Sequence, residues 1–164
     1  MAGTAWDLIR DIEEAKADLT QFSISPRNWG KFPKLPFTLS WNTVPFDSAS
    51  IKSIPAKSHG VYTFVIDPKV CSHPKNSFVA YVGKAERMTI RARFESYLRD
   101  KEKLKRPQIT YLLGKYYKNL AFCFLEVPSP HSIEHVEDSL IAALDPPFNH
   151  EQPVEVSLVR RGLT

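Results

Sequence analysis

The chain has 164 residues, of which 43% are hydrophobic, and a formal net charge of +4 at pH 7. This length suffices for one domain with a sizeable core, and no apolar run approaches the roughly 20 residues of a membrane-spanning helix. The first residues lack the charged and apolar regions of a signal peptide, and two cysteines are too few for a disulfide framework, although a single bridge stays open. We therefore expect one intracellular, cytoplasmic domain outside the membrane.

The positive charge is concentrated in one part of the chain. Residues 84–118 contain eleven Lys and Arg and four Asp and Glu, a local charge of +7. Residues 126–157 contain seven acidic residues and no Lys or Arg. Such a basic segment is typical of a surface that binds the phosphate backbone of nucleic acid, although a solvated pair of basic helices would give the same pattern.

The first part of the chain differs in composition from the rest. A capping-box-like start at Thr4 and an apolar repeat predict a helix that ends near Leu19. Prolines recur from Pro26 to Pro55 among aromatic residues, which excludes a long helix. We expect these aromatic side chains to pack on the domain, with stacking on nucleobases as the alternative. The best candidate for a short strand in this stretch is 37–41.

Two short runs rich in β-branched and aromatic residues come next. The segments 60–66 and 78–84 are predicted to form two strands of a hairpin, joined by a polar loop. Each strand carries a tyrosine near a glycine, in Gly60-Val61-Tyr62 and in Tyr81-Val82-Gly83. Lys84 follows the second tripeptide directly.

The helix predicted after the hairpin carries two arginines, Arg91 and Arg93. Its apolar residues place these arginines on opposite flanks, so only one of them can point at a site next to the hairpin. Beyond a charged connector, a second helix is predicted from Pro107, and 120–127 is apolar enough for a central strand.

The last predicted helix, from Ser132 to Leu144, carries an acidic residue on its apolar stripe. Glu137 stands four residues after Ile133 and three before Leu140. A buried carboxylate costs several kcal/mol unless a cation meets it. The interpretations are a structural ion pair with an arginine, a carboxylate at the edge of the core, and a metal ligand that faces the hairpin.

These elements resemble, in their order, the GIY-YIG nuclease family. The two tripeptides that name the family appear as Gly60-Val61-Tyr62 and Tyr81-Val82-Gly83. The helix pattern matches the family arginine to Arg93, whereas the spacing from the second tripeptide matches it to Arg91. The family glutamate matches Glu137, and its proline-containing turn that ends in asparagine matches 146–149. The resemblance covers about 90 of the 164 residues.

The resemblance implies a fold and a division of the chain. The fold would be α/β in the broad sense (α+β), with a small three-stranded, mainly antiparallel sheet flanked by helices. Residues 59–150 would form the nuclease core, 1–58 an N-terminal helix and Pro/aromatic-rich arm packed on it, and 151–164 a C-terminal tail.

The resemblance also implies roles for particular residues. Glu137 would hold one Mg²⁺ or Mn²⁺ ion, and Arg93 (or Arg91) would clamp a phosphate oxygen. Tyr62 would act as a base or orient a water, provided that positive charge such as that of Lys84 favoured its phenolate. Of the remaining residues, Tyr81 would share this network, Gly83 would give room for the backbone to approach, and Asn149 would hold the site together by hydrogen bonds.

The expected function is metal-dependent hydrolysis of nucleic-acid phosphodiester bonds, with DNA as the first substrate. Restriction, repair or recombination, and mobile-element roles stay open, and a homodimer would allow both strands to be cut. The alternatives are a nuclease of the same fold for RNA or single strands and a non-catalytic nucleic-acid-binding module. The residues expected to contact nucleic acid are Gly83, Lys84, Arg87, Arg99, Lys101, Lys103, Lys105 and Arg106.

Overall fold

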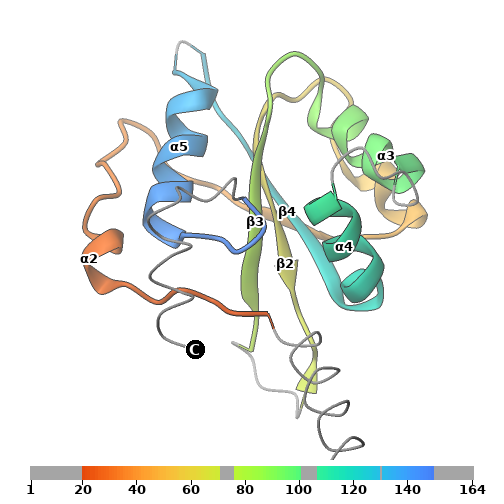
Figure 1. Cartoon of the computed structure of the whole chain (residues 1–164). Helices are drawn as coiled ribbons and strands as arrows, with labels where there is room; N and C mark the ends of the chain where they lie inside the picture. The colour runs from red at the N-terminus through yellow and green to blue at the C-terminus, as the bar shows by residue number, and fades with distance from the viewer. Residues whose placement is uncertain (1–19, 71–75, 101–106, 130, 150–164) are drawn as a thin grey trace, which may run out of the picture.

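A computed structural model of the chain describes residues 20–70, 76–100, 107–129 and 131–149. The fold of this part is α+β, with a four-stranded antiparallel sheet and helices on both of its faces (Figure 1). No helix in these ranges is long and apolar enough to cross a membrane. The helix predicted to end near Leu19, the charged connector and the tail lie outside the described residues.

The sheet is built around the predicted hairpin. Strands β2 (Gly60–Ile66) and β3 (Phe78–Ala85) pair antiparallel, and β4 (Leu120–Glu126) pairs with the other side of β2. The strand order is β1-β4-β2-β3, which leaves β3 at one edge. The hairpin and the central position of β4 are therefore confirmed.

The expectation of three strands is wrong, because a fourth strand, β1 (Asn42–Pro45), pairs antiparallel with β4. It lies just after the stretch in which a strand was expected, where Phe37 and Leu39 instead pack against the apolar cluster under the last helix. Pro45 has no N–H to donate, and an edge strand tolerates this loss. Which short segment pairs with the free edge of β4 is decided by the sheet rather than by the local sequence pattern.

The helices lie on two sides of the sheet, and the helices predicted after the hairpin are confirmed. Helices α3 (Ile90–Asp100) and α4 (Pro107–Tyr116) cover one face, followed by a short 3-10 turn at 117–119. Helix α5 (Ile133–Leu144) covers the other face, with the short α2 (Pro26–Trp29) beside it (Figure 1).

The Pro-rich segment packs on the domain through most of its aromatic residues. Phe46 is 2% exposed within the core under α3, and Phe32 and Phe37 pack against the cluster under α5. Trp29 and Trp41 keep 52% and 38% of their surface exposed. A 3-10 helix at 48–53 follows β1 and contacts α3. The expectation of packing is thus confirmed for the phenylalanines and only in part for the tryptophans.

Candidate active site

The acidic residue on the apolar stripe of α5 is paired with the lysine that follows the second tyrosine motif. Glu137 lies between the buried residues Val136 and Leu140, and its side chain is 15% exposed. Lys84 Nζ lies 3.3 Å from Glu137 Oε2 and 2.6 Å from Glu134 Oε1. The cation that meets Glu137 is therefore a lysine of β3 rather than an arginine, and Glu137 faces the hairpin.

The protein environment favours the charged forms of Lys84 and Glu134 but disfavours the charged form of Glu137. Burial raises the pKa of Glu137 above its ordinary value, and the attraction of Lys84 offsets this rise only in part. The hydrogen bond with Glu134 raises the pKa of Lys84, and the same bond lowers the pKa of Glu134. Lys84 is thus held mainly by the exposed Glu134, whereas the charge of Glu137 is kept at a cost in desolvation. Carboxylates of this kind are frequent at functional sites.

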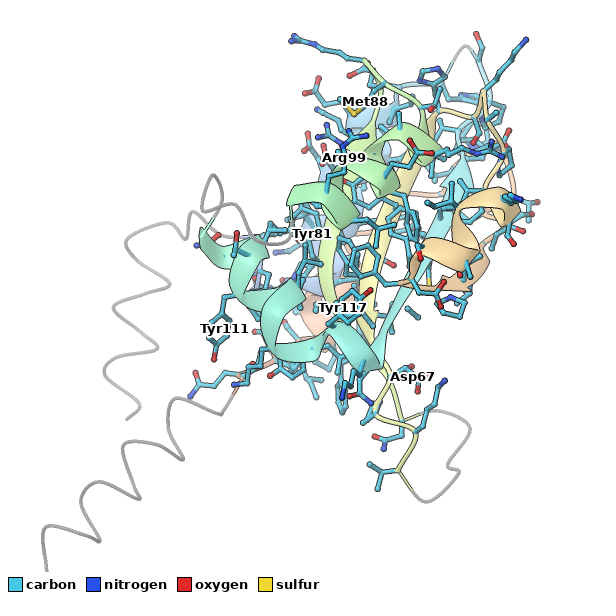
Figure 2. The ribbon with its side chains drawn as sticks, turned by 90° about the vertical axis from the view of Figure 1, so that its right-hand side faces the viewer. Asp67, Tyr81, Met88, Arg99, Tyr111 and Tyr117 are labelled. Atoms are coloured by element: carbon cyan, nitrogen blue, oxygen red, sulfur yellow. The ribbon has the colours of Figure 1, made fainter. Side chains whose placement is uncertain are left out.

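The two motif tyrosines lie on the opposite face of the sheet from Lys84. Tyr62 is 1% exposed, and its hydroxyl lies 2.8 Å from the hydroxyl of Tyr97 on α3. Tyr81 is half-buried, and its ring centroid lies 6.3 Å from that of Tyr62. Figure 2 shows Tyr81 between α3 and α4. Because Lys84 pairs with Val61 in the register, its side chain points to the α5 face instead.

The environment of Tyr62 disfavours its phenolate. Burial, together with the neighbouring Tyr97 and Tyr81, raises the pKa of Tyr62 well above its ordinary value. Arg93 lowers this pKa, but its effect is smaller. Arg93, and not Lys84 as expected from the sequence, is thus the cation beside Tyr62. At neutral pH the Tyr62 hydroxyl is protonated and acts as a hydrogen-bonding group.

The two arginines of α3 have different surroundings. Arg91 Nε donates a hydrogen bond to the carbonyl oxygen of Ile54, 2.6 Å away, and so ties the helix to the segment before β2. Arg93 Nε is buried without a hydrogen-bond partner. No acidic side chain in the described part of the chain forms an ion pair with Arg93. Among the described residues, the charge of Arg93 is therefore not balanced by an ion pair.

Asn149 attaches the turn after α5 to the edge strand. Its side-chain amide accepts a hydrogen bond from Val82 N and donates one to Val82 O, both at 2.7 Å. The backbone N–H of Phe148 donates to Ala80 O, 3.0 Å away. These bonds satisfy backbone groups that β3, as an edge strand, would otherwise leave unpaired. Asn149 thus ties the turn after α5 to β3 by hydrogen bonds.

Gly83 gives room to the ring of Tyr62 rather than to an approaching backbone. A Cβ built on Gly83 would lie 2.5 Å from both Cζ and Oη of Tyr62. Tyr62 pairs with Gly83 in the β2–β3 register, so the ring lies directly across the glycine. Three consecutive residues of β3 thus carry three distant motif residues: Asn149 on Val82, Tyr62 over Gly83 and Glu137 on Lys84.

Replacing Gly83 with Ala is expected to lower the free energy of unfolding by about 1–3 kcal/mol, the range for overpacking a core. The ring of Tyr62 is held on all sides by other aromatic residues and has little room to move. Urea denaturation would measure the change. Gly114→Ala is the control, because a Cβ at this exposed position in α4 meets nothing within 4 Å and should stabilise the helix. A Gly83→Ala protein as stable as the wild type would contradict the packing.

The predicted nucleic-acid contacts are placed only in part. Arg87 and Arg99 are exposed near the two ends of the segment that carries α3. Arg99 is labelled beside α3 in Figure 2. Four further residues lie outside the described ranges: Lys101, Lys103, Lys105 and Arg106.

Two residues of the site were not selected from the sequence. Glu134 holds Lys84, and its position one turn before Glu137 is the sequence signal that could have shown this. Tyr97 follows Arg93 by one turn, and its hydroxyl lies within hydrogen-bond distance of the Tyr62 hydroxyl.

The donor atoms around Lys84 suit a divalent cation. Oxygens of Glu134 and Glu137 already approach one cationic nitrogen, Lys84 Nζ, and carboxylate oxygens are the ligands that Mg²⁺ and Mn²⁺ prefer. Within the described ranges, no group of three or more His, Cys, Asp or Glu could hold a metal. A divalent ion at this place would have only the Glu134 and Glu137 oxygens as acidic ligands among the described residues, and it would have to displace the Lys84 ammonium.

Comparison with models of protein families, with curated proteins and with solved structures finds no match to this chain. Motif residues that are far apart in the sequence contact the end of β3, with Tyr62 on the α3 face of the sheet and Glu137 on the α5 face.

Proposed function

We propose that the chain is a divalent-metal-dependent endonuclease of the GIY-YIG type, which hydrolyses phosphodiester bonds of nucleic acid at the end of β3. The observation that carries the proposal is that residues far apart in sequence, each an element of the motif, contact three consecutive residues of one edge strand. These contacts come from Asn149, Tyr62 and Glu137.

Charge stabilisation would come from Arg93. Its guanidinium has no ion-pair partner among the described residues, and this group type could give parallel hydrogen bonds to two oxygens of a phosphate. Donors that are fixed in a poorly solvated site before the reaction stabilise the charge that develops on a phosphate more than donors in water do.

The acidic cluster would supply the metal site. Glu137 and Glu134 would hold one Mg²⁺ or Mn²⁺ ion. When bound, this ion would act as a Lewis acid toward the scissile phosphate. Lys84, once released from the carboxylates, would remain near the phosphate as a second cation. Tyr62 would keep its proton and, through Tyr97, keep α3 aligned on the hairpin.

DNA is the proposed substrate, and the enzyme would act inside the cell. The basic segment 84–118 supports binding to a phosphate backbone, and a homodimer would let both strands be cut. A nuclease for RNA or for single strands and a non-catalytic binding module are the other outcomes. Against the binding module stands the desolvation cost of Glu137, which a surface that only binds a polyanion does not need.

The proposal is tested by incubating the protein with supercoiled plasmid, single-stranded circular DNA and RNA, each with Mg²⁺, with Mn²⁺ or with a chelator. We expect metal-dependent cleavage of DNA that stops with the chelator. The same preparation of a Glu137→Gln variant controls for contaminating nucleases. Cleavage of RNA but not of DNA would replace DNA by RNA as the proposed substrate. Salt-dependent binding without cleavage of any of these nucleic acids would leave only the non-catalytic binding module.

A further inference from the structure

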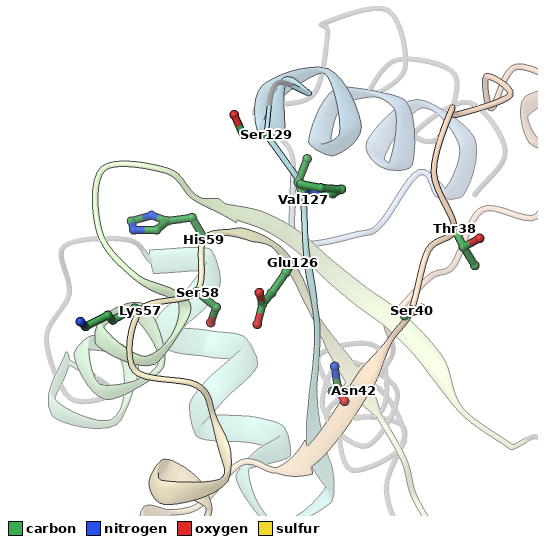
Figure 3. A pocket seen from close by; sticks show the side chains of 10 residues that line it. Thr38, Ser40, Asn42, Lys57, Ser58, His59, Glu126, Val127 and Ser129 are labelled. Atoms are coloured by element: carbon green, nitrogen blue, oxygen red, sulfur yellow. The ribbon is translucent and has the colours of Figure 1, made fainter.

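A polar cavity of about 570 Å³ lies where β4 ends and β2 begins (Figure 3). Glu126 lies in the middle of its lining in this view. Lys57 and His59 come from the segment before β2, and Ser40 and Asn42 come from the segment at the start of β1. The volume falls within the range of ligand pockets, about 300–1,000 Å³.

One polar side chain of this cavity is already engaged, since the Ser58 hydroxyl donates a hydrogen bond to Pro55 O. Among the residues that the structure describes, the side chains of Glu126, Lys57, His59 and Asn42 make no hydrogen bond or ion pair. The lining residues therefore include a carboxylate, an ammonium group, an imidazole and an amide, all on exposed residues. A ligand that has both donors and acceptors, together with a negative group, matches this set.

The cavity lies at the same end of the sheet as the candidate active site. Gly60, the first residue of β2, pairs with Ala85 at the end of β3 on one side and with Glu126 at the end of β4 on the other. Adjacent strands are about 4.8 Å apart, so the backbone of Glu126 is about 10 Å from that of Ala85, the residue after Lys84. A nucleic-acid strand that passes over this end of the sheet could therefore place one phosphate at the end of β3 and a neighbouring nucleotide at the cavity.

We propose that this cavity binds one unpaired nucleotide of the substrate strand, with its base against Glu126 and its phosphate against Lys57. The identification of the ligand as part of a nucleic-acid strand rests on the proposed function. A carboxylate only accepts hydrogen bonds, and it is best matched by two adjacent N–H donors on one base edge. Guanine presents such a pair, N1–H and the 2-amino group, once its base is unpaired, so the cavity should prefer guanine.

Calorimetric titration of the full chain at low salt with mononucleotides tests the proposal. GMP is expected to bind more tightly than IMP, which lacks the 2-amino group, and than AMP or UMP. Glu126→Gln should weaken GMP binding by about tenfold or more, since a charged acceptor is lost (tenfold is 1.4 kcal/mol). Lys57→Ala should weaken the binding of GMP and leave the affinity for guanosine, which has no phosphate, unchanged. Lys52→Ala removes the same charge from an exposed position outside the cavity, so it should change neither the affinity for GMP nor that for guanosine.

Equal affinity for the four nucleotides, absence of binding, or an unchanged affinity in Glu126→Gln would overturn the proposal. Thermal unfolding of each variant shows whether it remains folded. Glu137→Gln separates the two proposals, because it should bind GMP as the wild type does while it fails to cleave. If no nucleic acid is cleaved but GMP still binds through Glu126, the nuclease proposal fails and the nucleotide cavity stands. If cleavage occurs without GMP binding, only the cavity is rejected.

Discussion

Glu137→Gln is expected to lower the rate of metal-dependent cleavage by roughly 10³-fold and, at neutral pH, to leave the protein at least as stable as the wild type. The loss of activity follows from the loss of a charged ligand. The gain in stability follows from burial, which raises the pKa of Glu137 despite the ion pair with Lys84. A residue that only formed a structural ion pair would show the opposite stability change. Single-turnover cleavage and urea denaturation measure the two effects.

The pH dependence of this stability change has a definite sign. The folded-state pKa of Glu137 is higher than its unfolded value. Its carboxyl group therefore contributes to the stability of the folded wild type below the unfolded pKa, and this contribution is lost as the pH rises through the folded pKa. Glutamine does not titrate. The difference in unfolding free energy, variant minus wild type, should therefore increase with pH across this window and then level off.

Glu134→Gln is the matched control, since it makes the same change one helical turn away. The pKa of Glu134 is lowered by its bond to Lys84, so its charge favours folding above the unfolded pKa, and the variant should be slightly less stable at neutral pH. Its effect on cleavage should be smaller than that of Glu137→Gln, because Glu134 is exposed. A Glu137→Gln protein that is less stable than the wild type at pH 8 would contradict the assignment of Glu137 as a site residue.

Arg93→Lys is expected to lower the cleavage rate at saturating substrate by roughly 10²–10³-fold, the range for loss of one fixed donor to a developing anion. Lysine keeps the charge but cannot form the two parallel hydrogen bonds of a guanidinium. Affinity for uncleaved DNA should change little, because the basic segment 84–118 supplies most of the attraction to phosphate. Rates under single turnover and binding without metal would separate these two effects.

Arg91→Lys is the control for this variant, with the same substitution two residues earlier on the same helix. Arg91 Nε bonds Ile54 O, so its replacement should lower stability modestly and leave the cleavage rate of the folded protein close to that of the wild type. Arg93 Nε has no partner to lose, so Arg93→Lys should not destabilise the protein in the same way. A larger fall in rate for Arg91→Lys would reverse the assignment of the two arginines.

Much of the fold could be predicted because its elements have strong local patterns. The β-rich runs at 60–66 and 78–84 and the apolar repeat of α5 appear in the structure where they were predicted. The short β1 could not be found in this way, since four residues that pair at a free edge have little pattern of their own. The polar cavity beside Glu126 was also missed, because its lining comes from three separate segments.

By itself, the sequence determined the order and type of the strands and α-helices from β2 to α5 and the place of Glu137 on an apolar stripe. Period-two and 3.6-residue patterns depend only on neighbours in the chain. Only the tertiary structure decided which groups meet. The β2–β3 register sets Tyr62 across Gly83 and turns Lys84 toward Glu137 on the other face, and a shift of one residue would exchange these faces. Strand pairing at a distance, rather than local pattern, therefore decides that Arg93 stands beside Tyr62 and that Lys84 does not.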